Sequence, residues 1–292
     1  PWFYVNREAF YDFLERAPGH ITVMYGCHEA IAPDFMLFDY YIGLDTVPGS
    51  DRTVKLPYLR HHLQEVHGGK EGLDAHALLA SKTGFCNFIY ANRKSHPNRD
   101  AMFHKLSAFR FVNSLGPHLN NTPGDGHRAE DWYASSIRMK KPYKFSIAFE
   151  NAWYPGYTSE KIVTSMLAGT IPIYWGNPDI SREFNSASFI NCHDFPTLDD
   201  AAAYVKKVDE DDSLWCEIMS RPWKTPEQEA RFLEETERET AKLYKIFDQS
   251  PEEARRKGDG TWVSYYQRFL KRGHRMQPVS YTHLTLPTIL RV

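Results

Sequence analysis

Short apolar runs alternate along this chain with segments whose apolar residues recur every three or four positions. The runs have the length and composition of buried β-strands: HITVMYG (20–26), FDYYIGLD (38–45), FCNFIYAN (85–92), FRFVNS (109–114), FSIAFEN (145–151), IPIYWG (171–176) and SFINCHDF (188–195). The segments with helical spacing are KLPYLRHHLQEV (55–66), RDAMFHKLSAF (99–109), LDDAAAYVKKVDED (198–211) and EQEARFLEETERETAKLYKIF (227–247). This alternation is typical of βα units around a parallel sheet, so the pattern predicts an α/β protein.

The segment after FSIAFEN predicts a helix with clear ends. Thr158 or Ser159 can cap its start, and Gly169 ends it. Its buried face consists of four apolar residues at helical spacing: Ile162, Val163, Met166 and Leu167. Together with the strands on either side, this helix is part of a Rossmann-like domain.

The chain length of 292 residues favours two domains. A polar, Gly-rich break, HGGKEG, precedes a junction that we place near residue 80. The expected divisions are an incomplete α/β domain over 1–80, a Rossmann-like domain over 81–250, a helical segment over 251–277 and a tail over 278–292. The tail is almost uncharged and Thr-rich, which is typical of a non-native extension, and Pro1 indicates a fragment or a processed chain.

Charge and cysteine content narrow the class of protein. With 35 Lys and Arg against 37 Asp and Glu, the net charge is −2, so the whole molecule has no electrostatic reason to bind nucleic acid. The four cysteines form no CxxC pair, which is typical of reduced thiols in the cytoplasm and not of a zinc site. No run reaches the roughly 20 apolar residues of a membrane-spanning helix. We therefore expect a cytoplasmic protein with at most peripheral contact at the inner membrane.

The loop between FSIAFEN and the next helix carries a concentrated set of polar side chains. Glu150 and Asn151 end the strand, and Glu160 and Lys161 lie where the helix begins. In open α/β sheets ligands bind beyond the carboxyl ends of the strands, where helix N-termini attract anions. A lysine in the first turn is locally unfavourable because cations stabilise helix C-termini. The pattern predicts a bound anion such as phosphate beside Lys161, with an ordinary exposed first turn as the structural alternative.

Other candidate sites are weaker. Asp209, Glu210 and Asp211 could suggest a metal–diphosphate motif, but they lie in a charged helix, so we expect a solvated face. HHLQEVH (61–67) lacks the spacing of a zinc site and is expected at the surface or in an acceptor cleft. No GxGxxG follows a strand, which argues against a nicotinamide- or flavin-dependent oxidoreductase. A non-catalytic nucleotide- or sugar-binding module stays open.

The stretch YKFSIAFENAWYPGYTSEKIVTSMLAGTIPIYWGNP resembles the nucleotide-sugar signature of the bacterial α-1,3/4-fucosyltransferase family. The resemblance extends over most of residues 20–220, through PDFMLFDYYIGLD, DRTVKLPY, NRDAMFHKL and FNSASFINCHDF. It implies two Rossmann-like domains of the GT-B type and transfer of L-fucose from GDP-fucose to an N-acetylglucosamine-containing glycan, with inversion and without a metal or other cofactor. Another nucleotide-sugar transferase of the same fold is the alternative, and the oligomeric state is left open.

The resemblance also implies roles for individual residues. Arg99 and Lys161 match the cations that bind the donor diphosphate, and the positions around the fucose and nucleotide are Asn92, Glu150, Asn151, Tyr157 and Glu160. Glu29, four residues before Pro33, matches the carboxylate that acts as general base, with Asp34 and Glu65 as the alternatives. The chemistry requires such a set, because a departing diphosphate needs cations and an attacking hydroxyl needs a base.

Overall fold

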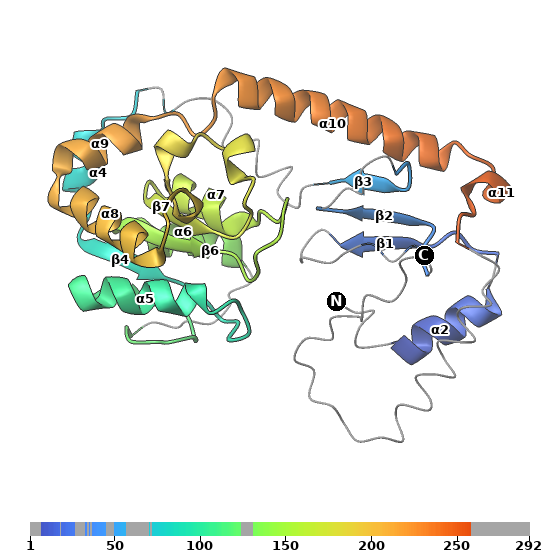
Figure 1. The fold of residues 1–292 in the computed structure, drawn as a ribbon, viewed down its shortest axis with the longest axis horizontal. Coiled ribbons are helices and arrows are strands. Elements are labelled where there is room, and N and C mark those ends of the chain that lie inside the picture. The colour runs from blue at the N-terminus through green and yellow to red at the C-terminus, as the bar shows by residue number, and fades with distance from the viewer. Residues whose placement is uncertain are drawn as a thin grey trace.

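The computed structural model describes residues 7–17, 19–26, 33, 35, 37–44, 50–56, 70, 72–123 and 131–257. It contains two parallel sheets, and Figure 1 shows them side by side, with helix α10 (Pro226–Phe247) starting at the C-terminal part and running along the N-terminal sheet. The expectation of an α/β fold built on parallel sheets is therefore confirmed.

The N-terminal sheet has the order β1-β2-β3, with β1 at Val23–Gly26, β2 at Tyr40–Gly43 and β3 at Thr53–Lys55. Both pairs are parallel, and Val23 lies opposite Tyr40 while Tyr41 lies opposite Thr53. Helix α2 (Arg7–Arg16) precedes this sheet. The strands predicted at 20–26 and 38–45 are present, whereas β3 is a strand that the apolar pattern did not predict.

The C-terminal sheet has the order β5-β4-β6-β7-β8, and all of its pairs are parallel. Its strands are β4 (Gly84–Phe88), β5 (Val112–Ser114), β6 (Tyr143–Phe149), β7 (Ile171–Trp175) and β8 (Ile190–Asn191). Its helices are α4 (Ala75–Ala80), α5 (Asn98–Phe109), α6 (Trp132–Lys140), α7 (Glu160–Leu167), α8 (Leu198–Glu210) and α9 (Asp212–Ser220). Short 3₁₀ turns η2 (Ile180–Arg182), η3 (Ser186–Ser188) and η4 (Cys192–Asp194) surround β8.

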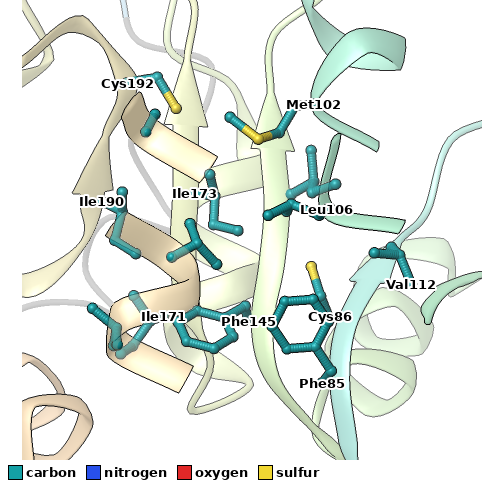
Figure 2. Close-up of a cluster of buried hydrophobic side chains, with 14 of the residues drawn as sticks. Phe85, Cys86, Met102, Leu106, Val112, Phe145, Ile171, Ile173, Ile190 and Cys192 are labelled. Carbon is teal, nitrogen blue, oxygen red and sulfur yellow. The ribbon is translucent and has the colours of Figure 1, made fainter. Parts of the chain in front are cut away.

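Alternation along the strands divides the core between the two faces of this sheet. Phe145 and Ile147 of β6 join a large apolar cluster with α5 and α8, and Figure 2 shows Met102 and Leu106 within it. Ala148 lies on the opposite face, in a second cluster with α7. A central parallel strand is covered on both faces, which explains why β6 reads as a continuous apolar run.

Two helices at the end of the described chain return to the N-terminal sheet. Helix α10 (Pro226–Phe247) packs against β3, and the backbone N–H of Lys55 donates to Glu239 Oε2 at 3.0 Å. Helix α11 (Pro251–Ala254) follows, after which the buried Asp39 carboxylate accepts bonds from the N–H groups of Arg256 and Lys257. Segments that follow the C-terminal sheet in the sequence thus pack against the N-terminal sheet.

Several expectations differ from the structure. Asp209 does not lie on a solvated face: its side chain is buried and pairs with Arg110 at 2.7 Å and Lys144 at 3.4 Å. The predicted strand 188–195 is only Ile190–Asn191, because 3₁₀ turns flank it, and α6 and α9 were not predicted. The helix expected at 55–66 and the HHLQEVH stretch lie outside the described residues, apart from Lys55 and Leu56. Within the described residues, no helix has the length and apolar character needed to cross a membrane.

Candidate active site

A buried carboxylate lies at the N-terminus of α7, immediately after β6. Glu150 Oε1 accepts the backbone N–H of Ser159 at 2.7 Å, and Oε2 accepts the Ser159 hydroxyl at 2.6 Å and Lys161 Nζ at 3.0 Å. The Ser159 hydroxyl also accepts a bond from Lys161 Nζ at 2.8 Å. We call these three residues the Glu150–Lys161 cluster.

This cluster resolves the local conflict of a lysine in a first helical turn. Ser159 is the N-cap residue, yet its hydroxyl makes no capping bond within α7 and donates to Glu150 instead. The carboxylate thus supplies negative charge at the positive end of the helix dipole and beside the lysine. An internal carboxylate therefore balances the charge of Lys161, and the phosphate expected beside this lysine stays a prediction.

The charged groups of the cluster shift one another's pKa values. Burial opposes the charge of Lys161, but the carboxylates of Glu150 and Glu160 raise its pKa well above the ordinary value for lysine. Burial raises the pKa of Glu150, and the nearby Lys161 counters that rise. Glu160 Oε1 lies 3.8 Å from Lys161 Nζ. Lys161 therefore stays protonated at neutral pH, with its side chain 16% exposed.

A second cation, Arg99, lies in the first turn of α5 and is buried. Its Nη1 donates to Asn151 Oδ1 at 3.2 Å, and its Nη2 donates to the carbonyl of Asn92. The guanidinium lies over the Tyr90 ring, with 4.3 Å between the guanidinium carbon and the ring centroid. Nε has no hydrogen-bond partner, and Asp100 Oδ1 is 3.7 Å away. Burial lowers the pKa of Arg99, although an arginine remains charged at neutral pH.

Tyr90 and Asn151 attach Arg99 to the end of β6, the strand that precedes the Glu150–Lys161 cluster. The Tyr90 hydroxyl accepts the N–H of Phe149 at 2.8 Å and lies 2.9 Å from the carbonyl of Ile147, so it is attached to the end of β6. The Asn151 carbonyl accepts the backbone N–H of His96 at 2.8 Å, at the entrance to α5. Arg99 and Lys161 are thereby held against the carboxyl ends of β4 and β6, the edge where open α/β sheets bind ligands.

The structure brings together most of the residues expected around the donor. Asn92 contributes its backbone carbonyl to Arg99, while its side chain accepts the N–H of Lys94 at 2.8 Å. Tyr157 is buried, and its carbonyl lies 3.5 Å from the Tyr174 hydroxyl. Glu150 is fully buried with both oxygens engaged, so it lies behind Lys161 and does not line an open surface. The assignment of Glu150 as a residue in direct contact with sugar does not fit this geometry.

The expected general base, Glu29, lies outside the described residues, as do the alternatives Asp34 and Glu65. Its role therefore stays a prediction.

Sequence reasoning missed three residues that support the cations. Tyr90 and Ser159 make the contacts described above, and Lys140 is buried with its Nζ 2.6 Å from Thr164 Oγ1. Burial lowers the pKa of Lys140 to about 7. The sequence does contain a signal for the buried contacts of Lys140, because Thr164 and Ser165 interrupt the apolar face of α7.

Comparison with known proteins gives a consistent result. Residues 79–255 match the family described as glycosyltransferase family 10 (fucosyltransferase), C-terminal part. An α-(1,3)-fucosyltransferase of Helicobacter pylori is 29% identical over 70% of this chain and 48% of its own length, and an α-(1,4)-fucosyltransferase of Arabidopsis thaliana is 25% identical over 64% and 55%. The chain spans about half or less of the length of the first curated relatives that it matches.

Among solved structures, a crystal structure of an α1,3-fucosyltransferase with GDP-fucose superposes with a TM-score of 0.59 and 28% sequence identity. The match covers 71% of this chain and 68% of that one.

Proposed function

The chain belongs to glycosyltransferase family 10, the fucosyltransferases, and from this membership we propose that it transfers L-fucose from GDP-fucose to a hydroxyl of an N-acetylglucosamine-containing glycan. The linkage formed is α-1,3 or α-1,4, with inversion at the anomeric carbon. The printed names of its relatives cover both linkages. We further propose that its acceptors are Lewis-type glycans of bacterial lipopolysaccharide, and that the enzyme is cytoplasmic and contacts the inner membrane only peripherally.

The observation that carries the proposal is the placement of Arg99 and Lys161. Two cations held at the carboxyl ends of adjacent strands can bind the diphosphate of a nucleotide sugar. Lys161, whose side chain is 16% exposed, serves as a point charge. Arg99 is 0% exposed and its Nη atoms contact Asn92 and Asn151, so it binds the diphosphate after a local shift that frees these donors. Arg99 Nε is buried without a hydrogen-bond partner, so one donor of the guanidinium is unused.

The chemistry follows from these positions. The acceptor oxygen forms a bond to C1 of fucose on one face while the bond from C1 to the diphosphate oxygen breaks on the other face, so the configuration inverts. Negative charge develops on the departing GDP, and Arg99 and Lys161 stabilise it in the transition state. The acceptor hydroxyl loses its proton to a carboxylate, for which Glu29 is our candidate. Because cations of the protein neutralise the leaving group, we propose that no metal is required.

The test is a reaction of the protein with GDP-fucose and N-acetyllactosamine, with the product linkage read by NMR. We expect an α-fucosyl product and release of GDP. A parallel thermal-shift series compares GDP, UDP and NAD, because only a ligand of the folded state raises the melting temperature. Stabilisation by UDP or NAD but not GDP would contradict the donor assignment, and binding of GDP without any transfer would indicate a non-catalytic module.

A further inference from the structure

A pocket of about 420 Å³ lies between the N-terminal sheet and the C-terminal domain, apart from the two donor cations. Leu44 and Lys55, at the carboxyl ends of β2 and β3, form one wall, and Pro155 and Gly156 of the β6–α7 loop form another. The contact between these walls is close: Gly156 has a φ of 78°, and a Cβ added there would lie 2.9 Å from the carbonyl oxygen of Leu44. Ligand pockets in proteins are typically about 300–1,000 Å³, so one or two sugar rings fit the space.

One face of α10 completes the pocket. Gln228, Arg231, Glu235 and Arg238 follow one another at spacings of three and four, which places them on the same side of the helix. The described lining contains five basic and three acidic side chains, an excess of positive charge in a chain whose net charge is −2. The pocket is therefore locally positive although the whole molecule is not.

Two basic side chains of the pocket lining, Lys55 and Arg238, lie beside carboxylates, whereas two others, Arg182 and Arg231, have no counter-ion among the described residues. Lys55 lies 3.7 Å from Glu235, and Arg238 Nε lies 3.1 Å from Glu239 Oε1. Arg182 and Arg231 are exposed on the pocket wall, and neither has a side-chain hydrogen bond or ion pair with another residue of the described ranges. Exposed arginines that face the same concave space and lack a protein carboxylate are suited to hold a carboxylate, sulfate or phosphate of a ligand.

A third cation lies deeper in the pocket. Lys224 is buried, and its Nζ lies 4.2 Å from the centre of the Phe232 ring and 5.4 Å from that of Phe184. The aromatic faces stabilise the ammonium without neutralising it. Glu183, which also lines the pocket, accepts a bond from Asn177 at 3.4 Å. The positive charge is thus spread along the pocket from Lys224 to the two arginines.

We propose that this pocket binds an acidic group, a carboxylate or sulfate, carried by the acceptor glycan, and that Arg182 and Arg231 determine this specificity. The inference rests on the proposed function. The donor diphosphate already has Arg99 and Lys161, neither of which is among the described lining residues. The β6–α7 loop contributes Gly156 to the pocket lining and Ser159 to the Glu150–Lys161 cluster, so one short loop connects the pocket to the donor site.

The experiment compares three acceptors: N-acetyllactosamine and the same disaccharide bearing either a sialic acid or a sulfate ester on galactose. For the wild-type protein we expect kcat/KM for the acidic acceptors to exceed that for the neutral one by about tenfold, on the scale of one charge-assisted hydrogen bond. In the double variant Arg182→Gln/Arg231→Gln, kcat/KM for the acidic acceptors should fall by about 10- to 100-fold, and that for the neutral acceptor by much less. Added NaCl should reduce the preference of the wild type because salt screens exposed charges.

The matched control is Arg138→Gln/Arg221→Gln, which removes two exposed arginines that pair with Asp131 and Glu217 and do not line the pocket. This control variant should keep the wild-type kcat/KM for the two acidic acceptors and for the neutral one. Equal losses on acidic and neutral acceptors, or a wild type that prefers the neutral acceptor, would overturn the proposal. A tenfold loss of GDP affinity in Arg182→Gln/Arg231→Gln would also overturn it, because the pocket would then hold the donor.

A failure of the proposed function gives a different result, namely no fucose transfer to any of the three acceptors. In that case saturation-transfer NMR measures binding of the sialylated disaccharide directly. Binding by the wild type that is lost in Arg182→Gln/Arg231→Gln supports the acidic pocket without the reaction, and absence of binding by the wild type refutes it.

Discussion

Replacement of Glu150 by Gln tests whether a buried carboxylate positions the diphosphate-binding lysine. In the native protein both carboxylate oxygens are engaged, by the N–H and hydroxyl of Ser159 and by Lys161 Nζ. Glutamine keeps the volume and one acceptor oxygen. Its NH₂ group, however, must face either Lys161 Nζ or the Ser159 hydroxyl, and the negative charge is lost.

The size of the effect follows from burial. The Glu150 side chain is 0% exposed and that of Lys161 is 16% exposed. Removing one partner of a buried ion pair costs about 3–5 kcal/mol because the remaining charge stays buried. Partial access of Lys161 to water favours the lower end, about 3 kcal/mol. Since about 1 kcal/mol lowers the Tm of a domain of this size class by roughly 2–4 °C, we expect a decrease of about 6–12 °C.

Thermal and urea unfolding measure the stability, and titration with GDP measures the donor site. Glu150→Gln should also weaken GDP binding, because Lys161 loses the contact that orients it. The control is Glu217→Gln, which removes an exposed ion pair with Arg221 at 2.7 Å and should change stability by less than about 1 kcal/mol. The double variant Glu150→Gln/Lys161→Met should lose less than the sum of the single variants. A Glu150→Gln protein with the wild-type Tm and GDP affinity would refute the reasoning.

Four further predictions concern the site. Arg99→Ala and Lys161→Ala should each lower kcat/KM by about 10²-fold or more, the scale of one lost transition-state stabiliser, and unchanged kinetics in both variants would exclude the two cations from catalysis. Glu29→Gln should lower kcat by about 10²- to 10⁴-fold and abolish the acidic limb of the rate profile while GDP affinity stays the same; near-normal kcat would place the base elsewhere. Activity should survive EDTA, and complete loss with recovery in Mn²⁺ would show dependence on a metal. Burial lowers the pKa of Lys140 to about 7 in the folded protein, whereas a lysine of the unfolded chain has a pKa of about 10.4. Between these two pH values the unfolded chain binds more protons than the folded protein, so the free energy of unfolding rises with pH. Lys140→Met should flatten this rise in urea midpoints measured at about pH 7 and about pH 9, and an unchanged slope would contradict the assignment.

Local pattern and spacing in the sequence determined many of the helices and strands and the location of the site. Helices α5, α7, α8 and α10 follow apolar residues that recur at the helical period. Strands β4, β6 and β7 follow continuous apolar runs, because a central parallel strand is covered on both faces. Gly169 ends α7 with a φ of 66°, as its position after the apolar face predicted. Arg99, Asn151 and Lys161 were located by a motif, and a motif records residue types at fixed offsets along the chain.

The partners of those residues were decided only by the tertiary structure. The anion beside Lys161 is Glu150, which the strand and helix bring back from eleven positions earlier in the sequence. Asp209 is buried because Arg110 and Lys144 reach it from other elements, although its own helix is charged. Arg182 and Arg231 share a pocket because α10 packs against β3 while its Gln228 donates to the carbonyl of Ser181, beside Arg182. Such contacts depend on distances in space between segments that local sequence does not relate, so burial, pairing and pKa emerge only when the chain is folded.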